Sequence, residues 1–330
     1  MTTSSTITDT ADRNGPHELT DLLIIGAGPK AVAVVAKAAA LRTLGLAVPR
    51  ITVVDPLGVA GNWTERGHWT TGRQPLGTPP EKDVGFPYAS HIAGERSSEV
   101  DDALFAFSWP QYLRSTGRYA SWVDRGRPHP THARWASYLQ WAAERAGMDL
   151  RIAEVVALDI DAGRWVATAS TANGLSLLSS RCLMVTGPGP ADRLPCGSGV
   201  AGVFSVADFW EAMACGSEVG DDVVVIGAGE TAGTIVAELG HRKVARIRMV
   251  SPGATAFSRG ESHFENAVFT SPAGWAGLAE SVRRDFIART DRGVFSTHVQ
   301  AELDALEEAS HVSGQVVRVA AHPAGASGWV

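Results

Sequence analysis

Two glycine-rich turns carry the residue types whose spacing could do chemistry. One is Gly26-Ala27-Gly28 and the other is Gly227-Ala228-Gly229, and each joins an apolar strand to a helix. At such a turn the free N–H groups and the dipole of the helix attract a pyrophosphate, and glycine lets the backbone approach it closely. Two turns in one chain predict two bound dinucleotides, and the usual chemical reason for holding two is electron transfer between them.

The first turn belongs to a strand–turn–helix–strand pattern. Residues 22–25 precede the turn, and a second apolar run at 51–54 ends at Asp55. A carboxylate there can accept hydrogen bonds from both ribose hydroxyls of an adenosine. We interpret the pattern as a dinucleotide site; the alternative is an ordinary βαβ unit with a chance glycine turn. Lys30 either adds to the positive field at the phosphate or is a solvated lysine on the first helical turn.

The segment after Asp55 favours a flavin over a nicotinamide in this first site. Residues 58–63 form a glycine-rich turn that carries Trp63, which suits a loop lying over a large planar cofactor. The alternative is a tryptophan that covers the domain edge, since buried aromatic residues are common. Residues 69–87 show little periodicity and read as a functional loop, which contains the Lys82-Asp83 pair.

The second site differs from the first at the end of its second strand. Residues 246–251 end in Ser251, where an NAD site usually has a carboxylate, and Arg259 follows closely. A hydroxyl and a guanidinium suit a 2′-phosphate, so NADPH is favoured over NADH; alternatively, Arg259 lies on a loop in solvent. Glu230 puts a negative charge at the phosphate turn, so we expect it to point away or to mark a weakened site.

The remaining pattern predicts an α/β fold with two Rossmann-like dinucleotide-binding domains of three layers and mostly parallel sheets, and a small helical substrate region. Strands are expected at 151–158, 165–168 and 182–187, and at 315–319; helices are expected at 104–115, 131–145, 278–289 and 298–309. The predicted divisions are a disordered tail (1–18), an FAD-binding domain (19–190), an NADPH-binding domain (191–256) and a partial substrate-binding region that returns toward the NADPH domain (257–330).

Composition narrows the class of protein. The chain has 330 residues, 45% of them hydrophobic, and a net charge of −6, which argues against general affinity for nucleic acid or an anionic membrane. Its three cysteines show no CxxC spacing, which favours a reducing compartment and excludes a disulfide reductase. The polar first 18 residues do not read as a signal peptide. We expect a cytoplasmic protein without a metal and leave a homo-oligomer open.

These motifs, in this order, resemble a known family. GxGPK, an acidic strand end, GxW, a Lys-Asp loop, a strand ending in Thr-Gly-Pro and GAGETA are similar to the class B flavin monooxygenases, and most of all to the microbial N-hydroxylating enzymes that act on ornithine and lysine in siderophore pathways. The similarity runs from about Leu19 to Phe269. It implies FAD and NADPH as cofactors and an amine or amino acid plus O2 as substrates.

The resemblance assigns roles to particular residues. The FAD-binding positions would be Gly26, Gly28, Pro29, Lys30, Asp55, Pro56, Trp63 and Gln74. The NADPH-binding positions would be Gly227, Gly229, Glu230, Thr231, Ser251 and Arg259. Lys82 would lie near the carboxylate of the substrate, and Asn266 would also bind the substrate. The alternatives are a solvated loop charge for Lys82 and a turn or capping residue for Asn266. No side chain need act covalently.

Three departures from the family pattern stand out. Glu230 replaces the usual Gln, Ser205 stands where relatives often carry His, and the Ala-Thr-Gly-Tyr strand and helix that finish the FAD domain do not occur before Val330. We therefore expect either a truncated form or a flavin pocket completed otherwise, for example by a partner chain.

The implied reaction is N-hydroxylation of a primary amine through a C4a-hydroperoxyflavin, with the protein supplying orientation and dryness. Two alternatives stay open. One is another class B reaction, Baeyer–Villiger or sulfide oxygenation, against which the Lys-Asp pair argues. The other is a degenerate nucleotide-binding module without activity.

Overall fold

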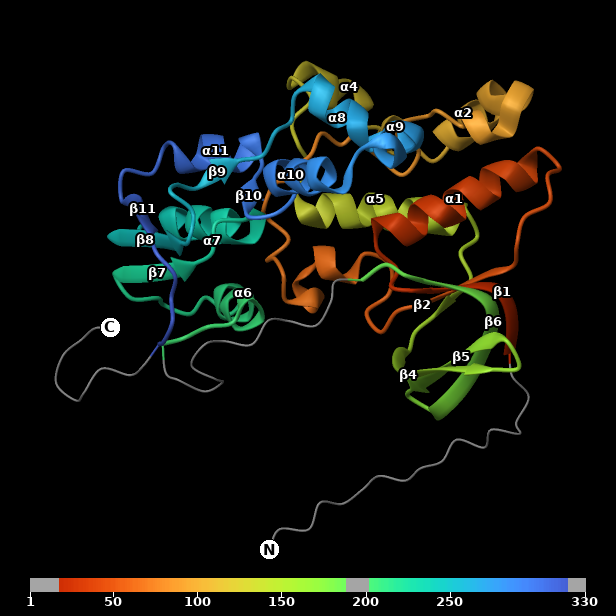
Figure 1. Cartoon of the computed structure of the whole chain (residues 1–330), viewed down its shortest axis with the longest axis horizontal. Coiled ribbons are helices and arrows are strands. Elements are labelled where there is room, and N and C mark those ends of the chain that lie inside the picture. Colours follow the sequence, from red (N-terminus) through yellow and green to blue (C-terminus); the bar gives the residue numbers. More distant parts are fainter. Residues whose placement is uncertain (1–17, 188–201, 320–330) are drawn as a thin grey trace, which may run out of the picture. The chain divides into compact units, whose positions relative to one another are not determined.

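The computed structural model of the chain describes residues 18–187 and 202–319 (Figure 1). It divides into two compact units, Met1–Arg73 with Pro80–Pro190 and Gln74–Pro79 with Ala191–Val330. Of the tail predicted at residues 1–18, residues 1–17 lie outside the described residues, and Glu18 is the first residue of a strand. Each unit is a separate α/β body built around one glycine turn.

The first unit is built on one six-stranded sheet with the order β3-β2-β1-β6-β5-β4. Strands β3, β2, β1 and β6 run parallel, and β5 and β4 continue the sheet antiparallel. The strands are β1 (Glu18–Ile25), β2 (Ile51–Val54), β3 (Leu150–Arg151), β4 (Glu154–Asp161), β5 (Arg164–Thr171) and β6 (Gly174–Val185).

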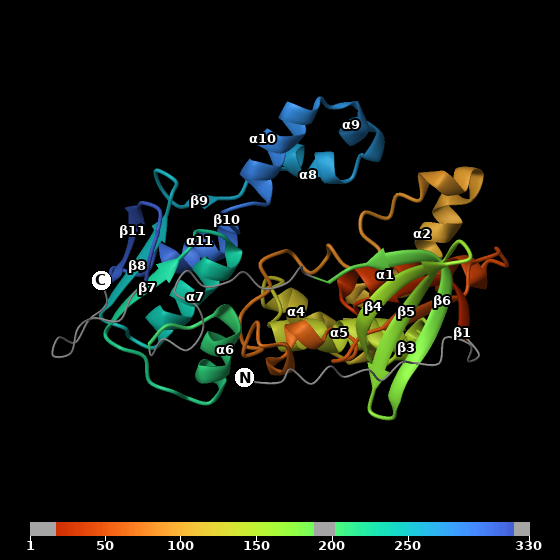
Figure 2. The ribbon, with the colours of Figure 1, turned by 60° about the horizontal axis from the view of Figure 1, so that its bottom comes forward.

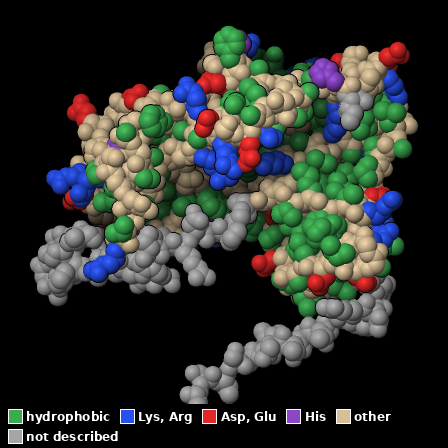
Figure 3. Space-filling view, viewed as in Figure 1, with side chains coloured by type: hydrophobic (Ala, Val, Ile, Leu, Met, Phe, Trp, Pro, Cys, Tyr) green, Lys and Arg blue, Asp and Glu red, His purple; other side chains and the backbone are tan. Residues whose placement is uncertain are grey.

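Strand β6 differs from the prediction. Residues 182–187 were expected to form a separate strand, but β6 is continuous from the Asn173-Gly174 turn to Val185. Its first half pairs with β5 and its second half pairs with β1, because tertiary partners decide where a strand continues. Strand β4 keeps several apolar side chains exposed, and Figure 3 shows hydrophobic groups gathered over this ribbon.

Helices α1 (Pro29–Thr43) and α5 (His132–Arg145) lie against each other on one side of this sheet (Figures 1 and 2). Helix α1 begins with Pro at its first position and is rich in Ala and Val, so it buries small side chains close to the strands. Helix α5 buries the expected face, Trp135, Tyr138, Leu139 and Ala142.

The other helical elements of the first unit are short. The helix expected at 104–115 is two helices, because Ser108 begins a new one by accepting a hydrogen bond from the N–H of Gln111. The elements are 3₁₀ turns η1 (Gly61–Trp63), η2 (Glu65–Gly67) and η3 (His91–Arg96), and helices α2 (Ser97–Phe105), α3 (Trp109–Ser115) and α4 (Tyr119–Asp124).

The second unit contains a three-stranded parallel sheet with the order β11-β8-β7 and a two-stranded ribbon, β10-β9. Its strands are β7 (Asp222–Ile226), β8 (Arg246–Ser251), β9 (Phe257–Ser258), β10 (Val294–Phe295) and β11 (Ala309–Ser313). Its helices are α6 (Val206–Ala214), α7 (Glu230–His241), α8 (His263–Phe269), α9 (Pro272–Gly277), α10 (Glu280–Thr290) and α11 (Thr297–Leu303).

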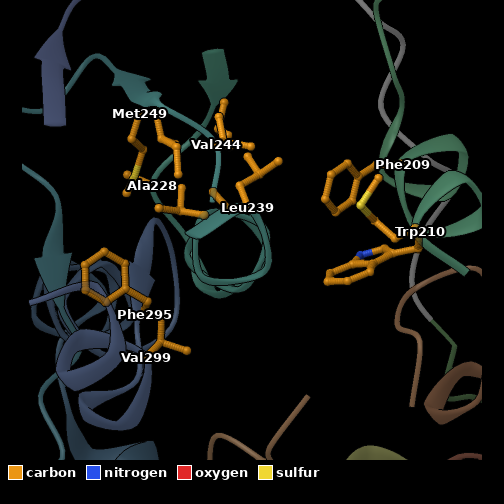
Figure 4. Close-up of a cluster of buried hydrophobic side chains, with 13 residues drawn as sticks. Phe209, Trp210, Ala228, Leu239, Val244, Met249, Phe295 and Val299 are labelled. Atoms are coloured by element: carbon orange, nitrogen blue, oxygen red, sulfur yellow. The ribbon is translucent and has the colours of Figure 1, made fainter. Parts of the chain in front are cut away.

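The hydrophobic core of the second unit surrounds α7 (Figure 4). Phe209 and Trp210 of α6, Met249 of β8, and Phe295 with Val299 are among its buried side chains. This packing explains why two predictions near the C-terminus were wrong.

The helix predicted at 298–309 ends at Leu303, and the strand predicted at 315–319 occurs at β11 instead. Strand β11 pairs with β8 and packs Ala309 against the core, whereas Val317 is 87% exposed. The α/β fold class with two Rossmann-like units is confirmed.

Candidate functional site

The first glycine turn is shaped by two glycines with different tasks. Gly26 has a φ of +99°, and a Cβ atom there would lie 2.7 Å from Oγ1 of Thr186. Gly28 caps α1 with a φ of −78°, and a Cβ atom there would meet nothing within 4 Å. Gly26 is therefore needed by the turn itself, while Gly28 leaves open space at the helix N-terminus, where a phosphate would approach.

Asp55 follows β2 beside this turn. Its Oδ2 accepts a hydrogen bond from the N–H of Ala27 (2.9 Å), and its Oδ1 accepts one from the N–H of Leu57 (2.8 Å), across the exposed Pro56. A carboxylate has about four acceptor positions, so both Asp55 oxygens can still accept hydrogen bonds from ribose hydroxyls. The residues present fit an adenine dinucleotide that carries no 2′-phosphate.

Trp63 is tied to the same turn through its backbone. The N–H of Ala60 donates to the carbonyl of Ala27 (3.0 Å), which holds η1 and Trp63 next to the glycine loop. The Trp63 ring meets His132 edge-on at 4.9 Å, and Nδ1 of His132 is 3.0 Å from Oγ1 of Thr70. Burial lowers the pKa of His132 to about 4, so this imidazole is neutral at neutral pH. No motif in the sequence marks His132, so it was not among the predicted site residues.

Two other predicted FAD positions lie differently. Lys30 is exposed on the first turn of α1. Gln74 belongs to the second unit, where its Nε2 donates to Oε2 of Glu238 (3.1 Å). Its role beside a flavin stays a prediction.

Asp83 organises the loop that carries Lys82. The Asp83 carboxylate accepts hydrogen bonds from the N–H of Gly85 (3.0 Å), the hydroxyl of Tyr88 (2.7 Å) and the N–H of Trp109 (2.8 Å). Burial raises the pKa of Asp83 above its ordinary value, and these donors counteract the rise. Lys82 itself lies over the Phe86 ring, with Nζ 6.0 Å from the ring centre. The sequence predicts the Lys82-Asp83 pair but gives no sign that Asp83 anchors the loop.

The second glycine turn repeats the geometry of the first. Gly227 has a φ of +129°, and its N–H donates to the carbonyl of Val250 (2.9 Å), as the N–H of Gly26 donates to Val54 (2.8 Å). The matched pairing makes Ser251 the counterpart of Asp55. A Cβ atom on Gly229 would lie 3.8 Å from Cα of Gly293, which is an ordinary van der Waals contact. Gly293 therefore limits the space on one side of Gly229 into which a ligand could come.

Ser251 and Arg259 bond to different partners. The buried Oγ of Ser251 is 2.9 Å from Nε2 of His311, on the neighbouring strand β11. Arg259 pairs with Glu261 (2.7 Å) and donates to the carbonyl of Gly77 (2.8 Å). The guanidinium is therefore partly neutralised, and the imidazole is the group beside Ser251.

Glu230 at the start of α7 has its carboxylate turned to Ser296. The Ser296 hydroxyl donates to Oε1 (2.9 Å) and the Ser296 N–H donates to Oε2 (2.5 Å). Both donors hold the negative charge on the α11 side. Thr231, the next residue, is exposed.

Asn266 lies on α8 of the second unit, and its Nδ2 donates to the carbonyl of Glu261 (2.8 Å). Lys82 belongs to the first unit. The two predicted substrate residues thus come from separate bodies of the chain.

The chain matches one protein family over residues 100–311, that of L-lysine 6-monooxygenase/L-ornithine 5-monooxygenase. It is also 46% identical over 299 residues to the L-lysine N6-monooxygenase MbtG of Mycobacterium sp. (strain MCS), covering 89% of this chain and 68% of that protein. The chain belongs to the lysine/ornithine N-monooxygenase family. The predicted resemblance to N-hydroxylating monooxygenases is confirmed.

Further similar proteins include a second MbtG and two solved structures. MbtG of Mycobacterium tuberculosis (strain H37Rv) is 43% identical over 312 residues, covering 94% of this chain and 70% of that protein. A solved structure of the lysine monooxygenase NbtG from Nocardia farcinica, described as having an unprecedented NADPH domain conformation, matches with a TM-score of 0.79 at 41% identity, over 92% of this chain and 73% of that one. The ornithine N-hydroxylase KtzI of Kutzneria sp. 744 matches at 17% identity with a TM-score of 0.69, which shows the shared fold (93% of this chain, 74% of that one).

None of the helices in the described part of this family member is long and apolar enough to cross a membrane.

Proposed function

We propose that the chain is an NADPH- and FAD-dependent monooxygenase that hydroxylates the side-chain amine of L-lysine. The named relatives at 43–46% identity act on L-lysine, which favours lysine over ornithine. The overall reaction balances as R–NH₂ + O₂ + NADPH + H⁺ giving R–NHOH + H₂O + NADP⁺. FAD and NADPH, when bound, supply the hydride and the activation of O₂.

The contrast between Asp55 and Ser251 carries the assignment of cofactors to units. Each residue directly follows the position that accepts the N–H of the turn glycine, Val54 before Asp55 and Val250 before Ser251. A carboxylate suits free ribose hydroxyls and repels a 2′-phosphate, whereas a hydroxyl accommodates that phosphate. We therefore assign FAD to Gly26, Gly28, Pro29 and Asp55, and NADPH to Gly227, Gly229, Thr231 and Ser251.

The remaining work of this chain is to bind and orient the amine. Lys82 is the proposed partner of the substrate carboxylate, held in place because Asp83 fixes its loop. Asn266 is the second proposed contact, with its amide oriented by the Glu261 carbonyl. A charged contact at the substrate carboxylate restricts the orientation of the amine and lowers the entropic cost of the reaction.

Product analysis tests the proposal. We expect the chain, supplied with FAD and NADPH, to form a hydroxylamine from L-lysine at a higher rate than from L-ornithine. Oxygenation of a ketone or sulfide in place of the amine would instead favour the other class B chemistry. Nucleotide binding with no product from any substrate would favour the degenerate module.

Lys82→Met tests the substrate contact with a built-in control. The KM for L-lysine should rise by about tenfold, because a charge-assisted hydrogen bond to the carboxylate is lost. The KM for cadaverine, the same diamine without the carboxylate, should stay unchanged. An equal rise for both substrates would contradict the assigned role of Lys82.

A further inference from the structure

At the end of its second strand the second unit has a polar pair, Ser251 and His311, where the first unit has Asp55 and an apolar neighbour. In the first unit the neighbouring strand β3 places Leu150 opposite Val53, two residues before Asp55. In the second unit the neighbouring strand β11 places His311 opposite Met249, two residues before Ser251. The first unit thus has Asp55 with Leu150 on the neighbouring strand, and at the equivalent positions the second unit has Ser251 with His311.

This pair is a bonded unit at the end of the sheet. Oγ of Ser251 and Nε2 of His311 are 2.9 Å apart. Ser251 is buried and shares a sheet face with the core residue Met249, since alternate residues of a strand point the same way. The backbone of the same region is tied down, because the N–H of Gly314 donates to the carbonyl of Ser251 (2.8 Å).

The direction of this hydrogen bond decides what the site can hold. If the Nε2–H of His311 donates to Oγ, the Ser251 O–H is left to donate to a ligand. If Ser251 donates to Nε2, its Oγ can only accept. A phosphate presents acceptor oxygens only, so it requires the first arrangement, whereas a ribose hydroxyl suits either.

We propose that His311 is a specificity-determining residue for the 2′-phosphate of NADPH, acting by turning the Ser251 hydroxyl outward as a donor. This inference rests on the proposed function, in which the second unit holds NADPH. It differs from the predicted role of Arg259, whose guanidinium pairs with Glu261 and donates to the carbonyl of Gly77, and the role of Arg259 stays a prediction. His311 acts through Ser251 and is a positioning residue.

Calorimetric titration of the whole chain with 2′,5′-ADP and with 5′-ADP tests the role, because these probes differ only in the position of the second phosphate and share the adenosine. We expect His311→Phe to weaken binding of 2′,5′-ADP by about tenfold and binding of 5′-ADP by less than about twofold. His311→Gln, whose amide N–H can donate from a similar place, should restore most of the affinity. Ser313→Ala, at an exposed position of the same strand, is the matched control and should change neither value.

The thermal midpoint of each variant separates binding from folding. A His311→Phe variant that keeps the wild-type ratio of the two affinities would overturn the inference and leave the proposed function standing. Loss of both affinities with an unchanged thermal midpoint would also overturn it, because the imidazole would then act on the whole nucleotide. A wild-type chain that binds neither probe would overturn both the inference and the proposed NADPH site.

Discussion

Gly28→Ala should separate cofactor binding from folding at the first glycine turn. Gly28 has a φ of −78° and a ψ of −173°, which alanine adopts without strain, and its Cβ would meet no atom within 4 Å. We expect the free energy of unfolding to change by less than about 1 kcal/mol, because the poorer helix cap is offset by a less flexible unfolded chain. FAD affinity should fall by at least about tenfold, or about 1.4 kcal/mol, because the methyl group takes the place of the phosphate.

Gly26→Ala, in the same turn, should instead lower the stability of the fold. Its φ of +99° and the 2.7 Å approach of a Cβ to Oγ1 of Thr186 should cost roughly 2 to 4 kcal/mol of stability. Urea unfolding of the FAD-free chain measures the stability, and the flavin absorbance retained after gel filtration measures binding. Gly220→Ala, at an exposed glycine with open space around it, is the matched control. A Gly28→Ala chain that binds FAD as tightly as the wild type would refute this reasoning.

Three further predictions concern single side chains. Burial lowers the pKa of His132 to about 4 from 6.5, so between these pH values the unfolded chain holds a proton that the folded chain does not. Stability should therefore fall, by up to about 3 kcal/mol, as the pH drops through this window, and urea unfolding of His132→Gln at stepped pH should show a flatter curve; equal slopes would contradict this. Asp83→Asn should destabilise the chain by about 2 kcal/mol or more, because an amide N–H₂ then faces N–H donors such as that of Trp109, and an unchanged thermal midpoint would argue against it. Ser251→Asp, which copies Asp55, should weaken NADPH binding by about tenfold and leave NADH binding intact, because a carboxylate repels the 2′-phosphate. Fluorescence titration with both nucleotides measures this, and equal losses for the two would contradict a role of residue 251 in distinguishing them.

The glycine turns could be predicted because their cause is local. A strand, a glycine with positive φ and a helix N-terminus follow one another within a few residues, so the sequence alone places Gly26 and Gly227. Asp55 could be predicted for the same reason, since it directly follows the second strand.

Features that depend on distant partners could not be predicted. Nothing local says that β6 continues past β5 to pair with β1, or that the last strand lies at Ala309–Ser313 beside β8. The partner of Ser251 is 60 residues away, at a position whose own neighbours carry no motif. The anchoring role of Asp83 depends on Trp109, which is 26 residues further along the chain.

Burial of charge also lies beyond the sequence. The neutral state of His132 follows from its burial against Trp63 and Thr70. The Glu230 carboxylate points to Ser296 because the N–H and the hydroxyl of that residue donate hydrogen bonds to it. The sequence shows Glu230 as a charge at a phosphate turn, which predicts that its carboxylate points away or marks a weakened site. The structure turns its carboxylate toward Ser296.

The most direct measurement is the stoichiometry of bound dinucleotides, obtained by native mass spectrometry of the whole chain with FAD and NADP⁺. We expect one FAD and one NADP⁺ per chain, with Gly28→Ala losing FAD alone and Gly229→Ala losing NADP⁺ alone. A single dinucleotide in the wild-type chain, or one substitution that removes both, would contradict the account of two independent nucleotide-binding units.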